Sequence, residues 1–241
     1  MKPFVAQLKA EIQLVLRNGE QLLLTIAIPV LLLVFFSLVD VLPTGTPDPV
    51  DFLAPGILAL AVMSTAMVSL GIGTGFERSC KVLKRLGATP LGRGRLLGAK
   101  IGSVVAVEIL QFAILVPVAY ALGWSPGSPN WVAATGGVIV GTIAFGGLGM
   151  MMAGRLRGEI NLAAQNGLYL VLLLLGGMVI PFSELPAWLR AGARCLPSGA
   201  LADILREALT GAGDRPGTSW IVLATWAIAT PLAASRLFRW E

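Results

Sequence analysis

Histidine is absent from the 241 residues of this sequence, and cysteine occurs only twice, at Cys80 and Cys195. Histidine is the commonest general base and the commonest metal ligand in proteins, so its absence weighs against most enzyme classes and against a metal site. Two cysteines are too few for a disulfide framework. A G-x-x-x-x-G-K-[ST] phosphate loop is also missing, which removes the usual ATP-binding motif. We therefore expect no catalytic residue, no metal and no cofactor held by this chain.

Charge is scarce as well. Charged residues make up 13% of the chain and hydrophobic residues 56%, whereas soluble domains carry roughly 25% charged residues. Six stretches are long and apolar enough to cross a bilayer, and each is predicted to be a helix because the backbone must satisfy its own hydrogen bonds in hydrocarbon. The predicted fold class is an all-α polytopic membrane protein with one domain over residues 1–241. The expected spans are 22–39, 52–73, 101–122, 131–153, 162–180 and 219–237.

The loops between these spans differ sharply in charge. With both tails counted, 14 of the 18 Lys and Arg residues fall on one side of the membrane and four on the other. Because Lys and Arg concentrate on the cytoplasmic side, both termini are predicted to be cytoplasmic. Arg outnumbers Lys by 13 to five, a bias that indicates a GC-rich bacterium. The expected location is therefore a bacterial cytoplasmic membrane.

The segment before the first span has a helical pattern of its own. In residues 1–19 the apolar side chains gather on one helical face, which predicts an amphipathic helix lying in the membrane interface. Asn18-Gly19 is expected to end this helix before the first span. The predicted face consists of Phe4, Val5, Leu8, Ile12, Val15 and Leu16.

Residues 181–217 lie on the external side between the last two spans, and the segment is too long for a plain connector. Ser183 and Ser198 each stand where a short helix could begin. We expect two short amphipathic helices that re-enter toward the membrane. The apolar stripe of the second is Leu201, Ile204, Leu205 and Ala208, opposite Asp203, Arg206 and Glu207.

The loop over residues 77–98 lies in the most basic stretch, "GFERSCKVLKRLGATPLGRGRLLGAK". Gly87 is expected to end a short helix, and Thr89-Pro90 to begin the next. Charge alone would suffice for a topology signal or an anionic-lipid anchor, whereas an apolar face with a defined end favours docking to a partner. Nucleic-acid binding is rejected because interleaved aromatic residues are missing. The short helix sets Val82, Leu83 and Leu86 against Lys81, Lys84 and Arg85.

Together these features resemble the transmembrane subunit of ABC type-2 permeases, over essentially the whole chain. The resemblance is carried by the flat N-terminal helix, the six spans, "ERSCKVLKRLGATPLGRGRLLGAK" after the second span and "IPFSELPAWLRAGARCLP" after the fifth. Drug-resistance permeases similar to the daunorubicin exporter often carry glutamate where Ser79 stands and glycine where Lys81 stands.

The resemblance implies that two such permeases, either identical chains or two sister chains, pair side by side in the membrane and contact its lipids. A coupling helix would sit in a groove of a separate cytoplasmic ABC ATPase, which binds ATP and Mg. The external helices would close the exit. The implied coupling residues are Glu77, Arg78, Lys81, Val82, Leu83, Lys84, Arg85, Leu86, Thr89 and Pro90. The implied external gate is Pro181, Ser183, Leu185, Pro186 and Trp188.

A few polar residues fall inside the spans. Glu108, with Gln111 nearby, would either line a path for a cationic or amphipathic substrate or be satisfied by Gln111, Lys100 or a neighbouring helix. Asn161, Gln165 and Asn166 would either line the same path or join helices, as amides in membranes most often do.

The function expected from these residues is the membrane subunit of an ATP-binding-cassette exporter. Its substrate would be an amphipathic drug or a lipid-like molecule, driven outward by a separate ATPase subunit. A membrane scaffold or regulator without transport is the alternative. A membrane-embedded enzyme fits less well because no catalytic constellation is present in the sequence.

Overall fold

The computed structural model describes residues 2–39, 48–87 and 92–238, and these residues form helices without strands. Six helices are long and apolar enough to cross a membrane. The predicted all-α polytopic fold is confirmed. The six spans are α2 (Gly19–Leu38), the continuous rod α3 (Pro49–Met63), η1 (Ser64–Ser69) and α4 (Leu70–Ser79), then α6 (Arg93–Ala121), α7 (Trp131–Ala153), α8 (Gly158–Leu175) and α11 (Pro216–Leu237).

Three span boundaries differ from the predictions by five residues or more. The second span continues to Ser79, and the third begins at the N-terminal end of α6, so much of the predicted 77–98 loop is helical. The fifth span ends at Leu175 instead of residue 180, because Gly177 adopts a positive φ of 62° that turns the chain out of the helix.

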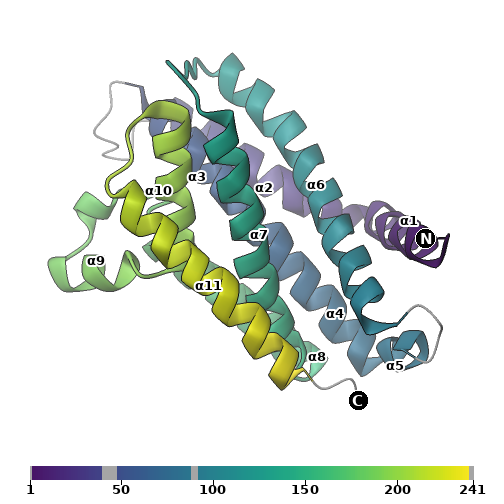
Figure 1. Cartoon of the computed structure of the whole chain (residues 1–241). Helices are drawn as coiled ribbons and strands as arrows, with labels where there is room; N and C mark the ends of the chain where they lie inside the picture. The colour runs from purple at the N-terminus through teal and green to yellow at the C-terminus, as the bar shows by residue number, and fades with distance from the viewer. Residues whose placement is uncertain (1, 40–47, 88–91, 239–241) are drawn as a thin grey trace.

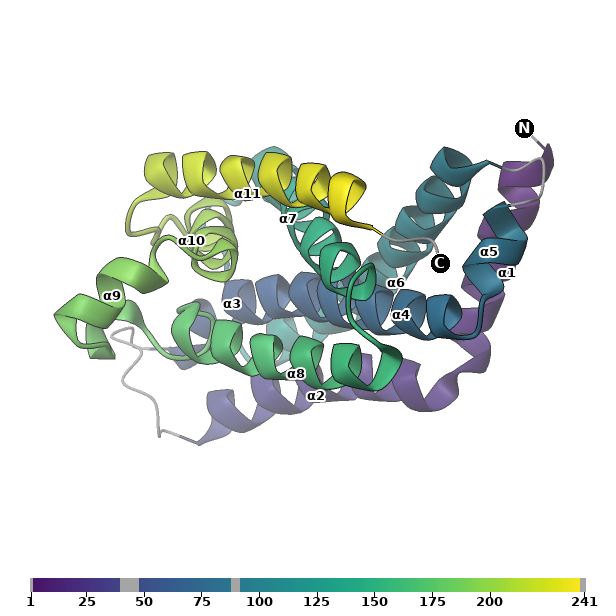
Figure 2. The same ribbon diagram turned by 90° about the horizontal axis from the view of Figure 1, so that it is seen from below.

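The rod formed by α3, η1 and α4 is the centre of the bundle, and 78% of its most apolar 18-residue stretch is buried. Helices α7 and α11 pack together on one side of it, while α2 and α8 run along another side (Figures 1 and 2). Helix α1 (Lys2–Arg17), α5 (Val82–Gly87) and both chain ends lie at one end of the bundle (Figure 1). Helices α9 (Ala187–Ala193) and α10 (Pro197–Thr210) lie at the other end.

Glycines allow the central helices to touch at backbone distance. A Cβ on Gly149 of α7 would lie 2.5 Å from the carbonyl oxygen of Met67 in η1. A Cβ on Gly71 of α4 would lie 2.1 Å from Nε2 of Gln165 in α8. Small residues at such crossings let helices pack closely in lipid, where apolar burial alone does not drive association.

Gly149→Ala is expected to destabilise the protein, because the added methyl meets a backbone oxygen. Overpacking of this kind costs about 1–3 kcal/mol. Gly73→Ala is the matched control, since Gly73 is also helical and a Cβ there meets nothing within 4 Å. Thermal unfolding of the purified chain in detergent compares the two variants. A Gly149→Ala protein that melts at or above the temperature of Gly73→Ala would contradict this packing.

Candidate functional site

The candidate site is the basic end, which we define as α1, the C-terminal end of α4, α5 and the N-terminal end of α6. A buried cation holds these segments together. Nζ of Lys100 on α6 lies 3.1 Å from Oε2 of Glu11 on α1 and 2.6 Å from Oε2 of Glu77 on α4. The side chains of Lys100 and Glu11 are 5% and 7% exposed. Buried charges of this kind are tolerated only when paired, so the three charges tie the three helices to one another.

Helix α1 lies across the ends of the spans, as expected of an interfacial helix (Figure 2). Its inner face fits against small residues of α6: a Cβ on Gly98 would meet the ring of Phe4 at 3.4 Å, and one on Gly102 would meet Leu8 at 2.8 Å. The apolar face predicted for residues 1–19 is only partly covered by the protein. Phe4 and Leu8 meet α6, whereas Val5 and Leu16 are 57% and 54% exposed, which leaves them available to the membrane surface.

The chain reverses between α4 and α5 at Lys81, whose φ is +59°. This left-handed conformation favours glycine, and glycine often stands at this position in the daunorubicin-type permeases that the sequence resembles. Helix α5 then begins at Val82, one residue later than the predicted helix that included Lys81, and ends at Gly87, as predicted; it is exposed along Lys84 and Arg85.

The apolar face predicted for α5 is divided in the structure. Leu83 is only 1% exposed and packs with Leu96 of α6, with Leu86 and Phe238 beside them. Val82, by contrast, is 38% exposed. The predicted grouping of Val82 with Leu83 is therefore wrong, because Leu83 anchors α5 to its own protein.

Two other predicted coupling residues turn toward the protein. Glu77 turns inward to Lys100, and Nη2 of Arg78 donates to the carbonyl oxygen of Leu156 at 2.5 Å, so both brace the basic end. Thr89 and Pro90, with the helix start predicted there, lie outside the described residues. Helix α6 begins at Arg93, directly after Gly92, whose φ is +73°.

Glu108 is 3% exposed in the middle of α6. The hydroxyl oxygen of Thr142 on α7 lies 3.0 and 2.9 Å from its two carboxyl oxygens. The interpretation of a group satisfied by a neighbouring helix is thus supported, although through Thr142 and not through Gln111 or Lys100. Glu108 is not among the lining residues of four prominent cavities, although its partner Thr142 lines one of them.

Gln111 supplies a hydrogen-bond donor that α2 lacks. Pro29 has no N–H, so the carbonyl oxygen of Thr25, four residues earlier, loses its helical donor. Nε2 of Gln111 donates to that oxygen at 2.9 Å, and Oε1 of Gln111 accepts from the hydroxyl of Thr65 in η1 at 2.8 Å. Gln111 therefore joins α6, α2 and η1 and is fully buried.

The three amides of α8 separate into two roles. Nδ2 of Asn161 donates to the carbonyl oxygen of Gly71 at 2.9 Å, and Nε2 of Gln165 donates to that of Gly149 at 3.0 Å. Both side chains are fully buried and join α8 to α4 and α7. Asn166 instead is exposed and, with Tyr169, lines a cavity between α2 and α8. Only Asn166 among them faces an open space.

The predicted external segment forms a short 3-10 turn, η2 (Phe182–Glu184), followed by α9 and α10. Trp188 is 77% exposed on α9, whereas Pro181 is buried. The remaining predicted gate residues, Ser183, Leu185 and Pro186, lie on the turn between them. Pro181 and Ser183 line one cavity at this end, whereas Leu185, Pro186 and Trp188 are not among its lining residues.

Helix α10 is more deeply placed than a surface amphipathic helix, and the prediction that Asp203 and Arg206 face away from the core is wrong. Nη2 of Arg206 donates to the carbonyl oxygens of Gly177 and Met178, and its guanidinium stacks 3.8 Å from the ring centroid of Phe52. Burial lowers the pKa of Arg206 to about 10, with Asp203 opposing the shift. The guanidinium stays charged at neutral pH and binds α10 to the ends of α8 and α3.

Several of these partners could not be found from spacing. Glu11 interrupts the predicted apolar face of residues 1–19, and an acid on that face was the one available signal. Lys100 directly precedes a predicted span, and the partner that the sequence suggests for it is Glu108. Thr142 has no distinguishing pattern in the sequence.

Residues 3–210 match the family model described as ABC-2 type transporter. The chain belongs to the ABC-2 type transporter family. It is also 26% identical over 193 residues to "Putative transport permease YvfS" of Bacillus subtilis (strain 168), a similarity that covers 78% of each protein. The family match includes α1, the basic end and α10, the parts described above.

As an ABC-2 type protein, the chain is the membrane subunit of an ABC transporter, and the family implies association with an ABC ATPase partner. The six apolar helices agree with a multi-pass membrane subunit. The basic end is therefore the candidate site of contact with such a partner.

Lys100→Met is expected to destabilise this ABC-2 permease and to release α1, because Glu11 and Glu77 then face each other without a cation. Removal of one partner from a buried pair costs about 3–5 kcal/mol. The melting temperature in detergent and the rate of proteolysis within α1 measure the two effects. The triple variant Glu11→Gln, Glu77→Gln, Lys100→Met removes the stranded charges and should recover much of the loss. A triple variant no more stable than Lys100→Met would contradict the ion-pair explanation.

Proposed function

We propose that this chain is the permease of an ABC exporter in a bacterial cytoplasmic membrane, with the basic end on the cytoplasmic side. The observation that carries the proposal is α5, a short helix that is anchored beneath by Leu83 and exposes Val82, Lys84 and Arg85, with Lys81 exposed in the turn before it. A rigid, anchored helix can transmit a displacement of its partner to the bundle, whereas a flexible charged loop can only attract the partner electrostatically. The exposed side of α5 is the surface that we assign to the ATPase.

The ion pairs of Lys100 support a route for the force. A push on α5 acts on α4, to which it is joined through the turn at Lys81, and on α6, against which Leu83 packs. Glu77 and Glu11 carry the same displacement to α1 through Lys100. Binding of ATP to the partner would thus move α1, α4, α5 and α6 together. Such a movement does transport work only if the substrate binds the two conformations with different affinity.

We place the substrate path and the second permease on the α2–α8 side. A cavity of about 400 Å³ opens there between the two helices. Asn18, Gln21, Thr25, Ser64 and Ser69 in its wall bond to one another or to their own helices. The amide of Asn166 and the hydroxyl of Tyr169 are the polar groups of the wall that favour a facing protein surface or a substrate with polar groups, because lipid tails cannot satisfy them. An amphipathic drug or lipid-like molecule meets this mixed lining. The polar lining residues are Asn18, Gln21, Thr25, Ser64, Ser69, Asn166 and Tyr169.

The double substitution Lys84→Glu, Arg85→Glu is expected to uncouple the complex without unfolding the permease, since both side chains are exposed. The ATPase that co-purifies with the full chain should be lost, or its rate should no longer respond to the permease. Lys9→Glu, Arg17→Glu reverses two exposed charges of α1 and is the control. Wild-type co-purification and ATPase rates in the α5 variant would overturn the coupling assignment.

Asn166→Trp is expected to block the path, because a bulky ring enters the α2–α8 cavity. Transport of daunorubicin, used as an amphipathic probe, into inverted membrane vesicles should fall severely while the ATPase still co-purifies. Val171→Trp on the same helix is the control, because Val171 is 48% exposed but does not line the cavity. If the wild type transports the probe and Asn166→Trp transports it equally well, the path lies elsewhere.

A further inference from the structure

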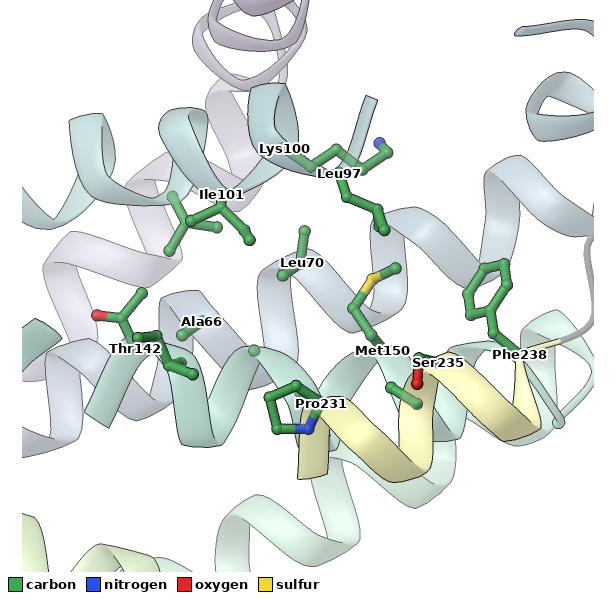
Figure 3. Close-up of a pocket in the computed structure, with 15 residues that line it drawn as sticks. Ala66, Leu70, Leu97, Lys100, Ile101, Thr142, Met150, Pro231, Ser235 and Phe238 are labelled. Carbon is green, nitrogen blue, oxygen red and sulfur yellow. The ribbon is translucent and has the colours of Figure 1, made fainter. Parts of the chain in front are cut away.

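Two cavities of the bundle differ in the polar groups that they offer to a ligand. One, of about 400 Å³, lies between α6 and α11 and is shown in Figure 3. The nitrogen of Lys100 is turned from its middle and is bound to Glu11 and Glu77. The hydroxyl groups of Thr142 and Ser235 are engaged with carbonyl groups of their own helices. The polar side chains described in this wall are therefore already satisfied, and the wall selects no polar ligand.

The other cavity, of about 550 Å³, is charged and lies at the end of the bundle opposite the basic end. Its wall is formed by the first turn of α3, by η2, α9 and α10, and by the segment that follows α10 (Figure 1). We call it the charged cavity. Its volume lies within the range of small-molecule sites, which is about 300–1,000 Å³. The charged residues of its wall are Asp51, Arg190, Arg194, Asp203, Arg206 and Asp214.

Four of these six side chains are compensated within the protein. The carboxylate of Asp203 accepts from two backbone N–H groups and from a hydroxyl group. Arg206 donates to backbone carbonyl oxygens, and Arg194 forms an ion pair with Asp214 at 2.5 Å. Two side chains of opposite charge are left over.

Asp51 and Arg190 are the remaining two, since neither forms an ion pair with a described residue. Each also carries a buried polar atom without a hydrogen-bond partner in the part of the chain that the structure describes, as does Arg194. The three atoms are Oδ1 of Asp51 and Nε of both arginines. Buried polar groups in proteins are almost always hydrogen-bonded, so these atoms need a partner from outside the chain. The charged cavity thus holds one unsatisfied acceptor and two unsatisfied donors.

The two arginines line the charged cavity from one side of α9. They are four residues apart, a spacing that places side chains on the same helical face. Nη2 of Arg190 donates to the carbonyl oxygens of Ser183 and Leu185 at 2.8 and 3.0 Å, which fixes its guanidinium group. Asp51 lines the cavity from another element, the first turn of α3. A ligand that meets all three side chains must carry both a positive and a negative group.

Charge excludes a simple ion as the matching ligand. An anion would bind the arginines but would be repelled by Asp51, and a cation would bind Asp51 but leave both Nε–H groups unpaired. Water bonds to either kind of group without supplying the opposite charge. A zwitterion supplies both charges. Guanidinium groups bind phosphate through directed N–H donors, and an ammonium group donates to a carboxylate.

The surroundings indicate which zwitterion fits. Trp188 on α9 is 77% exposed, and Trp residues of membrane proteins gather at the level of the lipid headgroups. The charged cavity shares α9 and therefore lies near this level. The phosphoethanolamine group, a primary ammonium joined to a phosphate by a short hydrocarbon link, is a zwitterion that phospholipids carry there. Phe52 and Phe182 give the cavity an apolar wall for the link.

We propose that the charged cavity binds a phosphoethanolamine group, from a phospholipid or as the free phosphomonoester, with the phosphate at Arg190 and Arg194 and the ammonium at Asp51. The bound group joins α9 to the first turn of the central rod and so stabilises the bundle at the end opposite the basic end. The proposal rests on the membrane location alone and does not depend on the substrate, the direction of transport or the coupling at α5.

The first arm of the test measures binding of free O-phosphoethanolamine to the full chain in detergent by isothermal titration calorimetry. The wild type should bind it more tightly than inorganic phosphate or ethanolamine, each of which meets only part of the site. Asp51→Asn should weaken this binding about tenfold or more, as expected for one charge-assisted contact, without weakening the binding of inorganic phosphate. Glu184→Gln, which removes an exposed acid outside the cavity wall, should bind as the wild type does.

The second arm reconstitutes the full chain in vesicles of equal phosphatidylethanolamine and phosphatidylcholine and identifies the retained lipid by native mass spectrometry. The two headgroups share the phosphate and differ in the N–H donors of the ammonium group. Preferential retention of phosphatidylethanolamine, lost in Asp51→Asn, identifies a lipid as the source of the group. Binding of the free compound without this retention identifies the free phosphomonoester.

The phosphate contact is tested separately with Arg194→Gln, which should weaken the binding of phosphoethanolamine and of inorganic phosphate alike. Arg215→Gln removes the same charge from an exposed residue outside the cavity wall and is the control. The melting temperature of each variant in detergent checks its fold. Asp51 has no ion pair and its buried oxygen no hydrogen bond among the described residues, so the Asp51→Asn result stands even if Arg194→Gln unfolds.

Either of two results contradicts the proposal. One is a wild type that binds free phosphoethanolamine no more tightly than inorganic phosphate and also retains the two lipids equally. The other is a folded Asp51→Asn protein that binds the phosphoethanolamine group, free or in the lipid, as the wild type does.

Discussion

The ion pairs of Lys100 are the constraint on which the basic end depends. A lysine at the mouth of a span would normally extend its ammonium group to the membrane surface. Here it stays buried, because Glu11 and Glu77 reach it from two other helices. Without that cation, α1 would carry a buried acid against α6, and α4 would end in another. The ion pairs thereby tie α1 to the two spans α4 and α6, and the packing of Leu83 on Leu96 adds α5 to them.

The remaining polar groups inside the bundle are mostly used for assembly. Gln111 replaces the donor that Pro29 lacks, Asn161 and Gln165 hold α8 to the central rod, and Glu108 is bound to Thr142. A substrate path needs groups that are not already engaged in this way. The α2–α8 cavity, with Asn166 and Tyr169 in its wall, offers them.

Much of the fold could be predicted from the sequence, because hydrocarbon imposes helices and the apolar runs are long. The flat helix before Asn18 and the short helix ending at Gly87 follow from local pattern and agree with the structure. Tertiary partners could not be predicted in the same way. Leu83 looked like part of a docking face, yet Leu96, thirteen positions later, covers it. Arg206 looked like a surface residue, yet the carbonyl groups at the end of α8 bury it. Pattern shows which face is apolar but not which surface covers it.

The most direct test is whether the basic end moves as one body when the ATPase binds ATP. Cys80 and Cys195 are both exposed, at opposite ends of the bundle, so spin labels on them report movement between the ends. A second pair, Lys9→Cys with Cys80 in a Cys195→Ser background, reports movement within the basic end. Pulsed electron spin resonance on the complex, diluted with unlabelled permease, gives both distances. We expect ATP trapping to change the Cys80–Cys195 distance and to leave the distance between positions 9 and 80 unchanged. A shift between positions 9 and 80 as large as that between the two ends would contradict movement of the basic end as one body.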